Sequence, residues 1–405
     1  MKSIIVLGRQ PALGVAELES LLGPGPISRL SDYPDGDIAL LDLDAVAVPF
    51  GRLGGSYKLM KVLNELPTTD AKQIETYLHN TIPEHLQYVP EGKFTLGLSF
   101  YGFAAMSPVK INAIGLRLKK TIKKTGRPVR IVPNKEPFLN AAQIIHNQLT
   151  GLNAWELNLV RNGDRTFLAQ TTEVQDIENY AARDQGRPQR DAKVGMLPPK
   201  LAQIIVNLAA DGMLPSGHTV LDPFCGTGVL LQEAALMGFD VYGTDLDPRM
   251  VEYSGGNLAW LKSRYNDRHF LTQVEVGNAT TASWQKLDTV ATELYLGQPL
   301  SKLPPADQLD KIVGQCDKLL GAFLRNLQHQ TVPGQRLCLA VPAWSLAAPG
   351  KPGGKPEAFR HLSTLDHLKD LGYNRVSFVL VRTENLIYHR PGQTVARELV
   401  VLTRI

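Results

Sequence analysis

The stretch from His218 to Asp247 constrains the fold more than any other part of the chain. Residues 219–221 are a short run typical of a buried strand, and a glycine-rich turn follows them. Residues 229–237 have helical composition, and residues 240–244 form a second strand-like run that ends at Asp245. Strand, glycine turn, helix, strand and acid is the order of half a nucleotide-binding α/β unit.

The residue types in this unit predict how it binds a ligand. Gly226 and Gly228 have no Cβ atom, so the backbone at the end of a buried strand can pass close to a ligand. The carboxylate of Asp245 can accept two hydrogen bonds from a ribose diol beyond the strand ends. A dinucleotide fingerprint needs a small residue where this chain has Leu231, and no Gly-Lys-Ser or Gly-Lys-Thr follows as in a P-loop. We therefore expect a nucleoside ligand, with a purely structural turn as the alternative.

The run Asp222-Pro223-Phe224-Cys225-Gly226-Thr227-Gly228 resembles motif I of the Rossmann-like S-adenosylmethionine methyltransferases. In that family a Pro-Lys-Leu segment before motif I helps to line the cofactor pocket, and residues 199–201 match it; the plainer interpretation is a helix that begins at a proline. Asn278, after the third strand, could bind the adenine edge or could be a turn asparagine. The residues that we expect to contact S-adenosylmethionine are Pro199, Lys200, Asp222, Phe224, Cys225, Gly226, Gly228, Asp245, Leu246, Asn278 and Ala279.

The 405 residues exceed one typical domain, and their patterns divide them into four parts. Residues 1–66 have a βαββαβ order, including a helix predicted over 45–53, which indicates a ferredoxin-like domain. Residues 67–175 form a second compact unit, and residues 176–200 are polar and arginine-rich, as suits an interdomain linker. The fourth part, residues 201–405, contains the glycine turn.

This fourth part alternates strands and helices, which predicts a doubly wound parallel sheet. Seven strands are expected, at residues 219–221, 240–244, 272–276, 287–292, 336–341, 375–381 and 398–403. The last two are joined by a segment without a helical pattern, so they should pair antiparallel. The fold class is therefore α/β, a Rossmann-like sheet of six parallel strands and one antiparallel strand, which matches the sheet of the S-adenosylmethionine methyltransferases. Residues 347–356, rich in proline, glycine and lysine, are expected to form a mobile surface loop.

The most basic part of the chain lies between residues 110 and 140, where Glu136 is the only acid. Lysine and arginine side chains that neutralise phosphates release counterions and so favour binding to nucleic acid. A solvated helix face that keeps the protein soluble explains the charges alone equally well. The strand, helix and hairpin pattern of residues 128–171 resembles a THUMP domain, an RNA-binding module. The expected RNA contacts are Lys110, Arg117, Lys119, Lys120, Lys123, Lys124, Arg127 and Lys135.

The strand expected over 287–292 leads into Thr292, Glu293, Leu294 and Tyr295. Methyltransferases that act on exocyclic amines of bases have Asp/Asn-Pro-Pro-Tyr/Phe there. In these enzymes a side-chain oxygen and a backbone carbonyl accept hydrogen bonds from both N–H groups of the amine, which turns its nitrogen lone pair toward the methyl donor. An aromatic ring stacks on the base. These four residues are therefore the candidate catalytic residues.

The chain departs from that pattern, because Glu293 replaces a shorter acid, both prolines are missing and Tyr295 comes one residue early. The longer side chain could displace the acceptor oxygen by about 1 Å, which would cost on the order of 100-fold in rate unless something compensates. An active enzyme and a catalytically weakened or retargeted one therefore both remain open. Tyr295 could instead be a core aromatic residue at a strand end.

Taken as a whole, the chain is similar to the THUMP-containing tRNA guanosine-N2 methyltransferases, which have the same order of ferredoxin-like domain, THUMP domain, linker and catalytic sheet. The resemblance implies methyl transfer from S-adenosylmethionine to the 2-amino group of a guanosine in tRNA, with the base unstacked into the pocket. The alternatives are an amino-directed DNA methyltransferase and an RNA-binding relative that is catalytically impaired by its altered motif. The resemblance leaves open whether a small activating subunit is needed; without one we expect a monomer.

Composition limits the remaining possibilities. The net charge of +4 is small, so contacts to nucleic acid must come from local clusters. Cys225, Cys316 and Cys338 are far apart, with no C-x-x-C and no nearby histidine pair, so neither disulfides nor a metal site is expected. No apolar run approaches the length that spans a membrane, and the first apolar residues are too few for a signal segment. We therefore expect a soluble, cytoplasmic protein that binds neither membranes nor metals.

Overall fold

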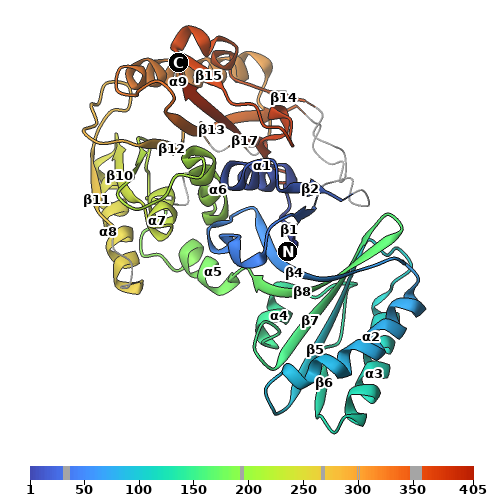
Figure 1. Ribbon diagram of the computed structural model, residues 1–405. Helices are drawn as coiled ribbons and strands as arrows, with labels where there is room; N and C mark the ends of the chain where they lie inside the picture. Colours follow the sequence, from blue (N-terminus) through green and yellow to red (C-terminus); the bar gives the residue numbers. More distant parts are fainter. Residues whose placement is uncertain (31–36, 192–195, 266–269, 299, 301, 347–357) are drawn as a thin grey trace. The chain divides into compact units, whose positions relative to one another are not determined.

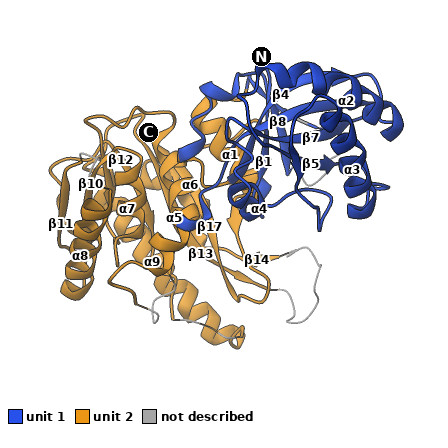
Figure 2. Cartoon of the chain, turned by 90° about the horizontal axis from the view of Figure 1, so that it is seen from below, with its two compact units in different colours: residues 1–11, 25–51, 56–178 blue, residues 12–24, 52–55, 179–405 orange. Residues whose placement is uncertain are grey.

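The computed structural model describes residues 1–30, 37–191, 196–265, 270–298, 300, 302–346 and 358–405. Close contacts between residues divide the described chain into two compact units, which are coloured separately in Figure 2. The first unit comprises residues 1–11, 25–51 and 56–178, and the second comprises residues 12–24, 52–55 and 179–405. Two short segments from the N-terminal region therefore belong to the same unit as the C-terminal half of the sequence.

In the described part of the chain, the first unit is built on one eight-stranded sheet with the order β2-β3-β1-β4-β8-β7-β5-β6. Its strands are β1 (Ser3–Leu7), β2 (Ile27–Arg29), β3 (Ile38–Leu41), β4 (Ser56–Leu66), β5 (Phe94–Tyr101), β6 (Val129–Ile131), β7 (Ala154–Asn162) and β8 (Arg165–Val174). Its helices are α2 (Ala71–His85), α3 (Pro108–Lys124) and α4 (Ala141–His146), with a short turn η3 (Leu86–Tyr88) after α2. Helices α2 and α3 lie side by side (Figure 1), and their apolar faces share a core with Phe94 and Leu159 of the sheet.

The strands on either side of residue 66 belong to the same sheet. Strand β4 pairs antiparallel with β8, from Lys58 opposite Val174 to Leu66 opposite Thr166. The two domains expected to meet at residue 66 therefore share one sheet. The pattern predicted over residues 128–171 is present as β6, α4, β7 and β8, whereas the division into a ferredoxin-like domain and a THUMP domain stays a prediction.

The helix predicted over residues 45–53 is wrong. The structure has two separate 3₁₀ turns there, η1 (Ala45–Ala47) and η2 (Phe50–Arg52). Pro49 lacks a backbone N–H and Gly51 is a poor helix former, so a continuous helix is unfavourable in spite of the apolar residues around them.

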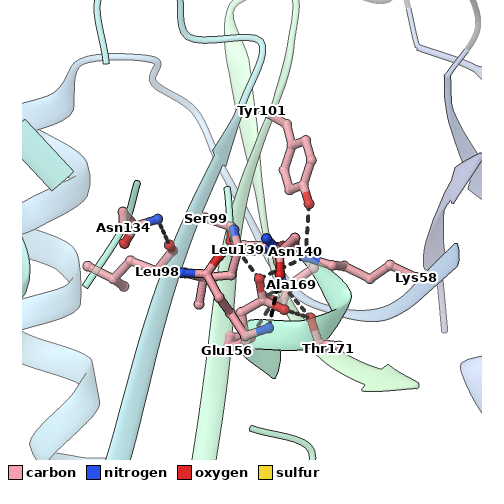
Figure 3. Close-up of polar contacts among 12 residues, drawn as sticks. Lys58, Leu98, Ser99, Tyr101, Asn134, Leu139, Asn140, Glu156, Ala169 and Thr171 are labelled. Atoms are coloured by element: carbon pink, nitrogen blue, oxygen red, sulfur yellow. Dashed lines mark hydrogen bonds and ion pairs between the residues drawn. The ribbon is translucent and has the colours of Figure 1, made fainter. Parts of the chain in front are cut away.

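A fully buried ion pair crosses the sheet of the first unit (Figure 3). The ammonium group of Lys58 on β4 lies 2.8 Å from Oε1 of Glu156 on β7 and donates a hydrogen bond of 2.9 Å to the hydroxyl of Tyr101 on β5. The same carboxylate accepts hydrogen bonds of 2.5 Å from the hydroxyls of Ser99 and Thr171. Because both charges are hydrogen-bonded on several sides, these contacts offset the desolvation cost of their burial, and the network fixes β4 against the strands beyond β8.

The second unit contains a nine-stranded sheet among the described residues. Seven strands follow the order β11-β10-β9-β12-β13-β17-β15, while β14 pairs with β13 and β16 pairs with β17. The strands are β9 (Thr219–Asp222), β10 (Asp240–Asp245), β11 (Thr272–Val276), β12 (Thr289–Glu293), β13 (Arg336–Ser345), β14 (Phe359–Arg360), β15 (Tyr373–Arg375), β16 (Ile387–Tyr388) and β17 (Val395–Arg404). Strands β9 to β13 run parallel to one another, and β17 runs antiparallel to both β13 and β15.

The direction predicted for each strand is confirmed along this seven-strand path, but two details are wrong. The sheet includes two further strands, β14 and β16, which have two residues each and are too short to produce a periodic pattern. The strand predicted over 375–381 lies at Tyr373–Arg375 instead, although its antiparallel pairing with β17 is as expected. The loop predicted over 347–356 lies outside the described residues.

The helices of the second unit are α1 (Pro11–Leu22, from residue 12), α5 (Ile177–Gln185, from residue 179), α6 (Pro199–Ala210), α7 (Val229–Leu236), α8 (Pro248–Arg264) and α9 (Ala306–Gln328), with short 3₁₀ turns η4 (Ser363–His367), η5 (Lys369–Leu371) and η6 (Thr383–Asn385). Helix α9 packs its apolar side chains, including Phe323, against Leu221 and Leu339 of the sheet. Helix α6 is almost entirely buried and contacts β12 and β13. None of the helices in the described ranges is both long and apolar enough to cross a membrane.

Two of the sequence segments in this unit are held by buried polar contacts. Glu17 of α1 is fully buried and accepts hydrogen bonds from the backbone N–H groups of Gly54 and Gly55, at 2.9 and 2.8 Å. In α5, Arg183 is buried and its Nε lies 2.6 Å from Oε1 of Glu233 on α7. The region expected to be a polar linker thus begins with a helix packed into the second unit, because its arginine has a buried acidic partner.

Candidate active site

The glycine turn after β9 and the end of β10 adjoin each other. The two strands are neighbours in parallel register, so their carboxyl ends lie at the same edge of the sheet. The backbone N–H of Gly226 donates a hydrogen bond of 2.9 Å to Oδ2 of Asp245, and the N–H of Cys225 donates one of 2.9 Å to the carbonyl of Thr244. The two loops that the sequence predicts to surround one ligand are therefore in direct contact.

The two glycines of the turn have different structural reasons. Gly226 has φ of +50° and Gly228 has φ of +77°, a region that side chains with a Cβ atom rarely adopt. A Cβ atom added to Gly226 would have no atom within 4 Å, whereas one added to Gly228 would lie 2.3 Å from Oγ of Ser254 on α8. Gly228 therefore permits the packing of α8, and Gly226 leaves open space beside Asp245.

Asp222 and Thr292 join the ends of β9 and β12 below this turn. Oδ1 of Asp222 accepts hydrogen bonds from Oγ1 of Thr292 at 2.5 Å and from the N–H of Phe224 at 3.2 Å. Both side chains are buried. Burial, together with the charges of Asp245 and Glu293, raises the pKa of Asp222 to about 7, although the hydrogen bonds from Thr292 and Phe224 lower it. This pair therefore fixes the strand ends and is not exposed to a substrate.

Glu293, the last residue of β12, forms an ion pair with Nε of Arg397 on β17. The two side chains are 16% and 8% exposed. The pKa of Glu293 is raised overall, because burial outweighs the charge and the hydrogen bond of Arg397, both of which lower it. Sequence reasoning missed Arg397, because only the order of β12, β13 and β17 in the sheet brings together two residues that are 104 positions apart.

Residues 187–341 match the family model described as RMKL-like, methyltransferase domain. This part of the chain has a methyltransferase fold. The structure of TrmN from Thermus thermophilus covers 100% of both chains with a TM-score of 0.50 and 17% sequence identity, a likeness that shows the fold alone.

Relatives in sequence match parts of the chain. The tRNA (guanine(10)-N2)-dimethyltransferase of Methanothermobacter thermautotrophicus is 32% identical over 186 residues, which are 44% of this chain and 48% of that protein. The protein of the same name from Pyrococcus abyssi is 42% identical over 84 residues, which are 21% of this chain and 22% of that protein. The chain thus spans about half the length of the first relative and less of the second.

Leu294 and Tyr295, the other two candidate catalytic residues, differ in exposure. Leu294 is buried, and its N–H donates a hydrogen bond of 2.9 Å to the carbonyl of Ala340 on β13. Tyr295 is 51% exposed, so its interpretation as a core aromatic residue is wrong. Its ring is available for contact with a substrate, although its role in stacking stays a prediction.

The remaining residues expected at the cofactor fall into two groups. Asn278 accepts hydrogen bonds on Oδ1 from the N–H and the hydroxyl of Thr280, at 3.0 and 2.8 Å, which is the geometry of a turn asparagine. Leu246 is exposed, next to Asp245. The other residues of the set have contacts within the protein. Pro199 begins α6, and the Lys200 ammonium lies 5.1 Å from the Tyr180 ring centroid. The Phe224 ring packs on Phe323, and Cys225 and Ala279 are buried.

The basic residues of the first unit differ in whether they have a structural partner. Arg117 on α3 pairs with Glu75 on α2, with Nη2 2.9 Å from Oε2, and this hydrogen bond lowers the pKa of Glu75. Arg127 donates hydrogen bonds of 3.2 and 3.0 Å to the carbonyls of Leu86 and Val89. Both arginines therefore have structural partners. Lys119 is half-buried, and Lys110 is exposed but donates a hydrogen bond of 2.9 Å to the carbonyl of Ala105. The other lysines of the predicted set are exposed: Lys120, Lys123, Lys124 and Lys135.

Proposed function

We propose that this protein transfers a methyl group from S-adenosylmethionine to the 2-amino group of a guanosine in tRNA. The observation that carries the proposal is the hydrogen bond between the N–H of Gly226 and the carboxylate of Asp245, at the carboxyl edge of a sheet with the methyltransferase fold. The names of the sequence relatives support the choice of tRNA guanosine as the methylated group.

The chain offers a suitable cradle for the adenosine part of S-adenosylmethionine. Each carboxylate oxygen of Asp245 already accepts one backbone N–H, from Gly226 or Asp247, and each has a second lone pair for a ribose hydroxyl. The open space at Gly226 lets the ligand approach the backbone. When bound, S-adenosylmethionine supplies an electrophilic methyl carbon: a new C–N bond forms as the C–S bond breaks, and its electron pair stays on sulfur.

The residues at the end of β12 would prepare the acceptor nitrogen. The carboxylate of Glu293 and the carbonyl of Leu294 would each accept a hydrogen bond from one N–H of the guanine 2-amino group. These two bonds would turn the nitrogen lone pair toward the methyl carbon. After transfer, one proton would leave the nitrogen through the carboxylate of Glu293 to water. Tyr295, which is exposed beside them, would stack on the unstacked base.

The exposed lysines of α3 would supply the contacts to the RNA backbone. Lys120, Lys123 and Lys124 are exposed in the last turns of this helix. Phosphate contacts of this kind give affinity without base specificity, so recognition of tRNA would depend on shape.

The decisive experiment incubates the protein with methyl-labelled S-adenosylmethionine and either total tRNA or duplex DNA. We expect label in tRNA, in guanosine N2 by mass spectrometry, and none in DNA. Glu293→Ala should abolish transfer and still bind S-adenosylhomocysteine in calorimetry, whereas Asp245→Ala should lose that binding. A wild-type protein that labels no RNA, or that labels DNA instead, would refute the assignment.

A further inference from the structure

Arg397 belongs to no motif, yet its place in the sheet links it to the end of β12. Ala340 on β13 lies opposite Glu293 on one side and opposite Leu399 on the other, so β13 separates the two partner strands. Arg397 lies opposite Pro342, two residues further along β13, where β13 and β17 extend beyond the end of β12. Its guanidinium reaches back across β13 to the carboxylate of Glu293.

The charges around Glu293 make this contact important. The carboxyl groups of Asp222 on β9, Asp245 on β10 and Glu293 on β12 end neighbouring strands, and the latter two raise the pKa of Asp222. Among the described residues, Arg397 is the only basic side chain that forms an ion pair with any of these three groups. Without it, a nearly buried glutamate beside other carboxyl groups would favour its neutral form, which donates a hydrogen bond on one oxygen.

The ion pair also fixes the direction of the carboxylate. Nε of Arg397 donates to Oε1, and Oε2 accepts no hydrogen bond from the described residues. A glutamate has one more rotatable bond than an aspartate, so an unrestrained carboxylate would sample positions away from an acceptor amine. An arginine that holds one oxygen leaves the other with a defined position.

We propose that Arg397 is a positioning residue for methyl transfer, which holds Oε1 of Glu293 so that Oε2 faces the acceptor amine. The inference rests on the proposed function and deepens it, since it explains how a longer acid without flanking prolines can still serve as the acceptor of an N–H bond. Arg397 acts through Glu293 and touches neither substrate directly.

The test compares Arg397→Met and Arg397→Lys with Arg375→Met. Arg375 forms a similar ion pair with Glu398 on β17, at 2.7 Å, but has no contact with Glu293 among the described residues, and is therefore the matched control. We expect Arg397→Met to lower kcat for tRNA by about 100-fold, the effect of a misplacement of roughly 1 Å, with KM and the Kd of S-adenosylhomocysteine within about threefold of wild type. Arg397→Lys keeps the charge and should recover about tenfold of this loss.

The pH profile separates positioning from a general loss of structure. In Arg397→Met the acid limb of the kcat profile should move to higher pH by about one unit, because Glu293 loses the partner that favours its ionised form. Arg375→Met should leave both kcat and this limb unchanged. Equal kcat and equal pH profiles in wild type and Arg397→Met would overturn the inference, as would an equal loss in Arg375→Met.

Two further outcomes remain decisive. If Arg397→Met does not fold, as judged by circular dichroism, the same comparison is made with Arg397→Lys, for which a wild-type kcat would overturn the inference. If the wild type methylates no RNA, the proposed function fails by itself. The titration of the Glu293 carboxyl by ¹³C NMR then tests the ion pair in wild type and Arg397→Met, and identical titration curves would overturn it.

Discussion

The two glycines of the turn after β9 provide a sharp test of the site, because alanine at Gly226 should mainly weaken ligand binding, whereas alanine at Gly228 should mainly lower stability. Gly226→Ala places a methyl group in open space, so the fold should lose only about 1–2 kcal/mol, the cost of a left-handed backbone conformation. The same methyl group would occupy the space proposed for the adenosine. An overlap of this size costs about 1–3 kcal/mol, which would weaken S-adenosylhomocysteine binding by roughly 5- to 150-fold.

Gly228→Ala should mainly destabilise the protein. The new Cβ atom would lie 2.3 Å from Oγ, 3.2 Å from Cβ and 3.3 Å from Cα of Ser254, so α8 would have to move. Overpacking and the left-handed conformation together predict a loss of about 2–5 kcal/mol in the free energy of unfolding. The double variant Gly228→Ala/Ser254→Gly removes the two nearest atoms and should recover part of that loss.

The assay combines urea unfolding with calorimetry of S-adenosylhomocysteine at a fixed pH. The expected pattern is a near-normal unfolding midpoint with weak binding for Gly226→Ala, and a lowered midpoint for Gly228→Ala. Wild-type affinity in a folded Gly226→Ala variant would show that the turn does not face the ligand. The proposed cradle would then have to be abandoned.

Three other perturbations follow from the structure. Lys58→Met should lower the free energy of unfolding by about 3–5 kcal/mol in urea titrations, since it leaves the buried Glu156 carboxylate without a counter-charge. A Lys58→Met/Glu156→Leu variant should recover most of the loss, and equal instability of both variants would contradict this account. Because the pKa of Asp222 is raised to about 7, the wild type should lose stability, by up to a few kcal/mol, as pH rises from about 4 to about 7. Asp222→Asn keeps an acceptor for the Thr292 hydroxyl and should flatten this pH dependence, whereas an unchanged slope would mean that another group titrates. Charge reversal at Lys120 and Lys123 should weaken tRNA binding and reduce the slope of log K against log salt concentration by about one unit per lost phosphate contact. Reversal at Lys72 on α2, which is also exposed, should have neither effect, and equal effects would mean that net charge alone decides binding.

Much of the site follows from local sequence. The turn at Gly226 and the acid at Asp245 could be predicted because each directly follows or ends a strand that is recognisable in the local sequence. Parallel strands place their carboxyl ends at the same edge of the sheet, so the two residues were expected to be close. Likewise, the alternating pattern of residues 219–403 was enough to predict the direction of every strand on the main path of the second sheet. Local patterns fail where elements are very short, as in β14 and β16, or where a proline interrupts apolar residues, as in the segment around Pro49.

Other features depend on residues that are far apart in the sequence, so no local pattern could predict them. The joining of β4 to β8 makes one sheet of segments that look separable, and it is crossed by the buried pair of Lys58 and Glu156, which are 98 positions apart in the sequence. Arg397 reaches Glu293 only because β17 inserts next to β13, antiparallel to it. The chemistry of Glu293 is decided there, since the charge of a nearly buried carboxyl depends on the groups that the fold brings within a few ångströms of it.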